Sequence, residues 1–110
     1  MVISECPVSV ALSVIGGKWK PLILYVLKQG PLRFGELRRQ VEGCTHKVIT
    51  EQLRELEADG VVSRKVVPGV TTTVEYRLSE YGETLRPVLT SLAAWGAQHV
   101  SASSTCLKPH

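Results

Sequence analysis

The sequence has little of what a secreted or membrane protein needs. Only three cysteines occur among 110 residues, at positions 6, 44 and 106. An odd number at irregular spacing does not resemble the disulfide framework of a small secreted domain. No apolar run is long enough to cross a membrane, and residues 1–5 have neither the basic start nor the apolar stretch of a signal peptide. We therefore expect a cytoplasmic protein with free thiols that does not contact a membrane.

Motifs of catalysis and metal binding are also missing. The chain has no phosphate-binding loop, no Ser-His-Asp pattern and no pair of carboxylates that would form a catalytic pocket. Cys44, His46, His99 and Cys106 are residue types that bind zinc, but their spacing matches no standard zinc pattern. We expect no enzyme activity, no metal and no cofactor.

What the chain does contain is a series of helical segments separated by clear breaks. Its 44% hydrophobic content excludes general disorder, and its length suits one domain with a modest core. Pro7 predicts the start of a first helix that runs to about Ile15, because proline is tolerated at the first helical position. Gly16-Gly17 breaks this helix, and a second one, starting at residues 18–21, ends at Gly30-Pro31.

Residues 32–78 predict a winged helix-turn-helix. A short helix at 34–41 leads through a break at 42–45 into a longer helix at 46–59, with Thr45 as its N-cap and a stop at Gly60. Ile49, Leu53 and Leu56 form its buried stripe. The runs 61–67 and 72–78, rich in β-branched residues, flank a Pro68-Gly69 turn and predict a hairpin. The predicted fold class is mainly α with a small β hairpin (α+β).

The C-terminal region predicts a dimerisation helix. Ser79 is expected to cap a last helix that runs to about His99, with a kink at Pro87. Its wide apolar face contains Leu85, Val88, Leu89, Leu92 and Trp95. A winged domain needs only part of this surface, so the rest, together with the first helix, predicts a dimer interface; an intramolecular lid is the alternative. Residues 6–99 form the predicted domain, and 100–110 a flexible tail.

Positive charge is concentrated in one part of the chain. The net charge is only +3, but residues 18–47 carry +5, whereas residues 48–110 carry −1. This asymmetry places the positive field where the helix-turn-helix begins. Charge alone would also suit an ordinary solvated surface; together with the order of elements it favours double-stranded DNA as the partner.

Several separated segments also carry a family resemblance. They are Cys6-Pro7-Val8, residues 15–20, 30–39, 53–60 and 74–78, and Gly82 with Leu85-Arg86-Pro87. Together they resemble the HxlR family of bacterial transcriptional regulators, relatives of the MarR-type winged-helix proteins. The resemblance spans about residues 6–99. It implies a homodimeric DNA-binding regulator, often a repressor, that recognises an inverted repeat. Some members of the family sense electrophiles or oxidants through a cysteine placed like Cys6.

Two segments depart from the family pattern. Thr71-Thr72-Thr73 lies at the end of the hairpin, where many relatives carry a cation. An arginine contact from the hairpin end is therefore not implied. The longer helix begins with Cys44 and His46, where Ile and Ser or Gln are common. The operator sequence of relatives therefore does not transfer to this chain.

The outward side of the 46–59 helix predicts the residues that read DNA. We expect His46, Lys47 and Thr50 to contact base edges, because Lys pairs with guanine and Thr touches a thymine methyl group. Phosphate contacts are expected from Arg38, Arg39, Arg54, Arg64 and Lys65. The alternative role of all of these is solvated surface, and some are expected to pair with Glu36, Glu55 or Glu57. Trp19 and Phe34 are expected in the core rather than stacked on bases.

The cysteines suggest a switch. Cys6 precedes Pro7 and therefore stands at a helix N-cap, where the helix dipole favours a thiolate that electrophiles and oxidants attack. The alternative is a small buried residue without a redox role. Cys44 and Cys106 are further redox candidates and alternative disulfide partners of Cys6, and the sequence does not choose between them.

The predicted function is a transcriptional regulator, expected to be a repressor, that binds a palindromic operator as a homodimer and is switched by thiol modification at Cys6. A regulator that responds to a small-molecule effector without redox chemistry is one alternative. A winged-helix module that binds protein rather than DNA is another.

Overall fold

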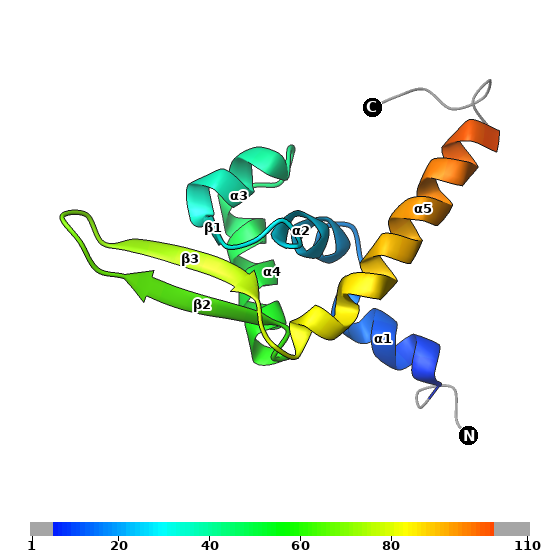
Figure 1. The fold of residues 1–110 in the computed structure, drawn as a ribbon, viewed down its shortest axis with the longest axis horizontal. Helices are drawn as coiled ribbons and strands as arrows, with labels where there is room; N and C mark the ends of the chain where they lie inside the picture. The colour runs from blue at the N-terminus through cyan, green and yellow to red at the C-terminus, as the bar shows by residue number, and fades with distance from the viewer. Residues whose placement is uncertain (1–5, 103–110) are drawn as a thin grey trace.

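The predicted helix-turn-helix and hairpin form one side of the molecule (Figure 1). A computed structural model describes residues 6–102. In chain order its elements are α1 (Pro7–Ile15), α2 (Lys20–Leu27), β1 (Leu32–Arg33), α3 (Phe34–Gln40), α4 (His46–Ala58), β2 (Val62–Val67), β3 (Thr73–Leu78), the 3-10 helix η2 (Gly82–Leu85) and α5 (Arg86–Ala102). The mainly α class with a small β component is confirmed, and the bounds of α3, α4, β2 and β3 lie within one residue of the prediction.

The sheet has one strand more than the predicted hairpin. Its order is β1-β3-β2, and both pairings are antiparallel. β2 and β3 pair from Val62 opposite Leu78 to Val67 opposite Thr73. The two strands and the turn between them form the wing, residues 62–78, and its turn projects away from the helices (Figure 1). The short β1 joins the other edge of β3, with Leu32 opposite Tyr76. This pairing fixes the start of α3 beside the wing.

The core is formed by the apolar sides of four helices, which pack against one another. Fully buried side chains come from α2, α3, α4 and α5, and they are Ile23, Leu24, Leu27, Leu37, Ile49, Leu53, Leu56 and Leu89. The predicted stripe of α4 is therefore confirmed. Trp19 and Phe34 pack partly buried against this core, as expected. Thr45 is the N-cap of α4, and its Oγ1 accepts a hydrogen bond from Val48 N at 3.2 Å.

The C-terminal region differs from the prediction of one kinked helix. Ser79 does not cap α5: it lies before η2, whose N-cap is Tyr81, and its Oγ accepts from Gly82 N at 2.8 Å and donates to Gly60 O. Gly82 sits so close to β2 that an added Cβ would lie 2.0 Å from Val61 O. Pro87 is the second residue of α5, where its missing N–H breaks no helical hydrogen bond, so the predicted kink within a helix is wrong. α5 continues to Ala102, and residues 103–110 of the predicted tail lie outside the described residues.

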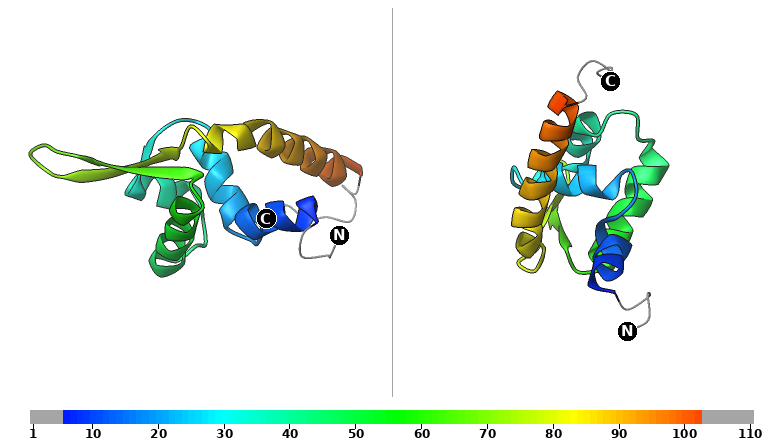
Figure 2. Two further views of the ribbon diagram at one scale, coloured as in Figure 1. Left: turned by 90° about the horizontal axis from the view of Figure 1, so that it is seen from below. Right: turned by 90° about the vertical axis from the view of Figure 1, so that its right-hand side faces the viewer.

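Helices α1 and α5 lie at the end of the molecule opposite the wing (Figures 1 and 2). Arg86 fixes the start of α5, because its guanidinium donates to Lys28 O at 2.9 Å and to the Glu83 carboxylate at 2.7 Å. The Arg86 hydrogen bond lowers the pKa of Glu83. Within residues 6–102 no single helix is long and apolar enough to span a membrane; α1 and α2 meet such a test only as a pair bent by 77°.

One ion pair ties α2 to α4 across the core. Lys20 Nζ donates to Glu55 Oε1 at 2.6 Å. The Lys20 side chain is 10% exposed and that of Glu55 is 57% exposed, so the two partners differ in their access to water. The buried ammonium group of Lys20 needs Glu55 as its hydrogen-bond partner, whereas the exposed carboxylate of Glu55 can bind water when Lys20 is absent.

Removing Glu55 should therefore destabilise the fold more than removing Lys20. For Glu55→Ala we expect a loss of about 1–3 kcal/mol in the free energy of unfolding, because a buried ammonium loses its partner. Lys20→Met should cost less than about 1 kcal/mol, because it keeps the apolar stem and leaves Glu55 in water. Urea unfolding of both variants measures the difference, and equal or reversed losses would contradict this account of the pair.

Candidate nucleic-acid interface

The outward face of α4 is open to solvent and projects from the body of the molecule (Figure 2). Its side chains His46, Lys47 and Arg54 are exposed, and Thr50 is half-buried. The opposite face carries the buried stripe, and α4 packs against the core through that face. A helix exposed in this way has the shape of a recognition helix that enters the DNA major groove.

Thr50 offers a restricted set of contacts. Its Oγ1 donates to the backbone carbonyl of His46 at 2.8 Å. Because the hydroxyl hydrogen is used inside the helix, the side chain presents its methyl group and the remaining oxygen lone pair to a partner. This arrangement suits a thymine methyl group or an amino donor of a base better than a phosphate.

His46 is positioned by the start of α3. Its ring centroid lies 4.8 Å from that of Phe34, with the rings tilted by 54°. Phe34 also faces Tyr76 of β3, with 6.4 Å between the ring centroids. These contacts connect the first residue of α4 to both the neighbouring helix and the sheet, and they hold the imidazole at the exposed end of α4.

The structure brings Arg54 and Arg64 together but separates Arg64 from Lys65. Arg54 of α4 and Arg64 of β2 line one open hollow of about 360 Å³ together with Thr50, Glu57 and Tyr76. Lys65 is the next residue of the strand and therefore points to the other face of the sheet, where it stands opposite Glu75. Phosphate contacts by the two cations would thus lie on opposite faces of the wing.

Arg38 and Arg39 are exposed in the last turn of α3. Within residues 6–102, none of the five predicted phosphate cations lies within 4.0 Å of a carboxylate oxygen. The expected pairing with acids is therefore wrong for this part of the chain. Glu55 binds Lys20 instead, and Glu36 accepts a hydrogen bond from Arg33 N at 2.9 Å.

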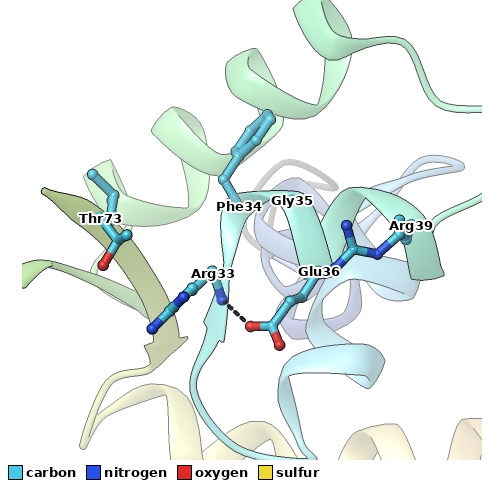
Figure 3. A pocket seen from close by; sticks show the side chains of 7 residues that line it. Arg33, Phe34, Gly35, Glu36, Arg39 and Thr73 are labelled. Atoms are coloured by element: carbon cyan, nitrogen blue, oxygen red, sulfur yellow. Dashed lines mark hydrogen bonds between the residues drawn. The ribbon is translucent and has the colours of Figure 1, made fainter. Parts of the chain in front are cut away.

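Two residues at the interface were not predicted as site residues. Tyr76 lines the hollow with Arg54 and Arg64, and Arg33 lies beside Thr73 of the wing at the start of α3 (Figure 3). The pairing of β2 with β3 sets Tyr76 opposite Arg64, whereas the pairing of β1 with β3 sets Arg33 opposite Glu75. The short run Leu32-Arg33 was the only available signal, and it does not specify its partner strand.

The cysteines lie in different environments. Cys6 is the N-cap of α1, as predicted; it is half-exposed and makes no capping hydrogen bond with its side chain. Cys44 is buried in the core, and burial raises the pKa of its thiol. Cys106 lies outside the described residues. Among the described residues, no three or more His, Cys, Asp or Glu side chains are grouped so that they could hold a metal ion.

Comparisons with known proteins agree with this fold. Residues 14–104 match the HxlR-like helix-turn-helix family. The chain is 52% identical over 94 residues to the uncharacterized HTH-type transcriptional regulator YtcD of Bacillus subtilis, covering 86% of this chain and 75% of YtcD. The redox regulator HypR in its oxidized form superposes with a TM-score of 0.81 at 47% identity, covering 84% of this chain and 96% of that chain. The reduced form of the regulator YodB from B. subtilis gives a TM-score of 0.74 at 37% identity, covering 86% and 93%.

The family match covers most of the chain and includes the whole helix-turn-helix and the wing. The relatives and solved neighbours are named as transcriptional regulators. The protein belongs to the HxlR-like helix-turn-helix family and is a transcriptional regulator of the HxlR/MarR type rather than an enzyme.

Proposed function

We propose that this protein acts in the cytoplasm as a homodimeric repressor that binds an inverted-repeat operator in double-stranded DNA. The observation that carries the proposal is the exposed face of α4, with Lys47 and Arg54 on it, beside a wing that carries Arg64. His46, Lys47 and Thr50 are assigned to base edges in the major groove. Arg38, Arg39, Arg54, Arg64 and Lys65 are assigned to phosphates, which orient the protein without reading sequence.

Lys47→Ala tests the assignment of α4. Loss of a contact to a base edge should weaken binding to the preferred operator by about 1–3 kcal/mol and reduce the preference for it over random DNA. The operator is first selected from random-sequence duplexes with the wild-type protein, and affinities are then measured by gel shift. Lys28→Gln is the matched control, since Lys28 Nζ binds Thr90 Oγ1 of α5, away from α4. A Lys47→Ala protein with unchanged affinity and selectivity would remove α4 from the readout.

The assignment of the homodimer rests on the apolar surface opposite the wing. Exposed apolar side chains gather on α1 and α5, among them Val8, Leu12, Leu92 and Trp95. Exposed apolar side chains on two helices at the same end of the molecule favour burial against another protein surface. A dimer formed there would leave both copies of α4 outside the interface, as an inverted repeat with two half-sites requires.

Trp95→Asp should separate the two chains. A carboxylate placed in the apolar interface is costly to desolvate, so we expect association to weaken by at least about tenfold. Val70→Asp introduces the same kind of change at the exposed wing turn and should leave association unchanged. Sedimentation velocity distinguishes the results. A wild-type protein that sediments as a single chain at micromolar concentration would overturn the dimer.

Cys6 is proposed as the switch because it begins α1, a helix of the proposed dimer surface. With a quinone, the thiolate sulfur forms a bond to a ring carbon, and the ring gains a proton and becomes a hydroquinone thioether. With diamide, Cys6 and a second thiol form a disulfide, while two electrons and two protons reduce diamide to the hydrazine. Either product would displace α1 and alter the spacing of the two α4 helices. The solved neighbours HypR and YodB, a redox regulator and a regulator solved in its reduced form, support this proposal.

Cys6→Ser should abolish the response to oxidant, whereas Cys44→Ala should keep it. Burial raises the pKa of Cys44 and keeps that thiol protonated, so it reacts slowly. In the wild type we expect diamide to lower operator affinity by about 5- to 150-fold, a typical range for coupling between sites. Gel shifts before and after diamide, and after reduction with dithiothreitol, provide the measurement. A Cys6→Ser protein that responds as the wild type does would rule out this switch.

A small-molecule effector without redox chemistry is the second candidate. An open, mostly apolar hollow of about 410 Å³ lies between α1 and η2, and its lining includes Pro7, Val10, Val14, Tyr81 and Leu85. Its volume is in the range of small-ligand sites. A compound bound there would act on α1 directly, so it would change operator binding in Cys6→Ser as strongly as in the wild type. A module that binds only protein is the third candidate, and it would give no shift with any DNA fragment.

A further inference from the structure

A second hollow, distinct from the one between α4 and β2, lies where the start of α3 meets the wing (Figure 3). It is open to solvent and has a volume of about 420 Å³. Its lining residues come from β1, α3 and β3 and are Arg33, Phe34, Gly35, Glu36, Arg39, Thr73 and Val74. Since β1 pairs only with Glu75 and Tyr76 of β3, residues 73 and 74 lie beyond the end of β1 and form the side of this hollow.

Two guanidinium groups stand on either side of the hollow (Figure 3). Arg33 extends toward the wing, whereas Arg39 folds back over α3, with an Nη1 that lies 3.7 Å from the position of a Cβ on Gly35. Neither guanidinium lies within 4.0 Å of a carboxylate oxygen of residues 6–102. The Glu36 carboxylate between them accepts from Arg33 N at 2.9 Å. Both arginines are therefore available to bind an anion, whereas the negative charge of Glu36 would repel that anion.

The position of the hollow relative to α4 indicates which anion it would meet. Its lining residue Phe34 contacts His46, the first residue of α4, with 4.8 Å between ring centroids. In a helix-turn-helix the second helix enters the major groove, and the first helix crosses the sugar–phosphate backbone beside it. The hollow lies at the start of that first helix.

We infer that this hollow is a seat for the DNA backbone, in which Arg33 contacts one phosphate and Arg39 a neighbouring one. The inference rests on the proposed function and adds Arg33 and Glu36 to it. Arg33 is a contact residue without sequence preference, because a guanidinium pairs with phosphate on any duplex. Glu36 fixes the start of α3 through Arg33 N and limits the affinity for DNA through its charge.

Arg33→Gln and Glu36→Gln should change DNA binding in opposite directions. Arg33→Gln loses one phosphate contact, so the slope of log affinity against log salt should become shallower by about 0.9. A fourfold rise in salt would then weaken the variant about 3.5-fold less than the wild type. Glu36→Gln keeps an oxygen that accepts from Arg33 N and removes the charge, so it should bind roughly two- to threefold more tightly. Unfolding caused by a substitution would not produce tighter binding.

The probes are a duplex selected by the wild-type protein and a random-sequence duplex of the same length. Arg77→Gln is the control, because it removes a charge from the same sheet, from a residue that lines another hollow and lies 4.0 Å from Glu75. It should keep the wild-type slope. Wild-type binding to neither duplex would overturn the proposed function and this inference together. Salt-dependent wild-type binding, with Arg33→Gln at the full slope and Glu36→Gln at wild-type affinity, would overturn the backbone seat alone.

Discussion

The packing of α4 onto the core from one side is the constraint on which the rest of the structure depends. Ile49, Leu53 and Leu56 are almost completely buried, and they recur on one face of the helix. Burial of three such side chains contributes several kcal/mol, of the order of 1.5–3 for each. Because that face alone carries the packing, residues on the other face are unconstrained by the core. The outward residues can therefore be selected for a partner without cost to the fold.

Three acidic residues of the described chain interact with groups other than the outward cations of α4. Glu55 is held by Lys20 at 2.6 Å, on the side toward α2. Glu36 accepts from the backbone of Arg33, and Glu83 is bound by Arg86 far from the wing. These three carboxylates are thus engaged locally, and Arg38, Arg39, Lys47, Arg54 and Arg64 form no ion pair within residues 6–102. A net charge of only +3 is compatible with DNA binding for this reason.

The sequence was sufficient for features that are encoded locally. Thr45 as a cap, Gly60 as a stop and the apolar spacing in α4 all lie within a few residues of the structure they determine, and the predicted bounds of α4 agree with the structure within one residue. The start of α5 was not predicted correctly, because a capping residue such as Ser79 ahead of the apolar face that begins at Leu85 fits one long helix as well as a 3-10 turn. The close approach of Gly82 to Val61 O determines where the 3-10 turn ends and α5 starts. This contact joins two separate segments, and the spacing of apolar residues along the chain does not reveal it.

The candidate site was predictable to the same extent and for the same reason. Lys47, Thr50 and Arg54 follow from the helical period once the buried stripe is known. Arg33 does not, because its place beside Thr73 depends on β1 joining β3, and two residues carry too little pattern to specify a partner strand. The Lys20–Glu55 pair joins residues 35 positions apart and is likewise absent from any local signal.

These long-range contacts also connect the two ends of the molecule. Trp19 and Lys20 are adjacent at the start of α2, one residue after the Gly16-Gly17 break that follows α1. Trp19 lies against Gly43 in the turn before α4, at 3.7 Å from its Cβ position, and Lys20 holds Glu55 in the third turn of α4. The start of α2 thus contacts the turn before α4 and, through Glu55, the third turn of α4. A displacement of α1 would reach α4 through contacts that already exist, and α4 would move as a rigid body because its stripe is packed along its whole length.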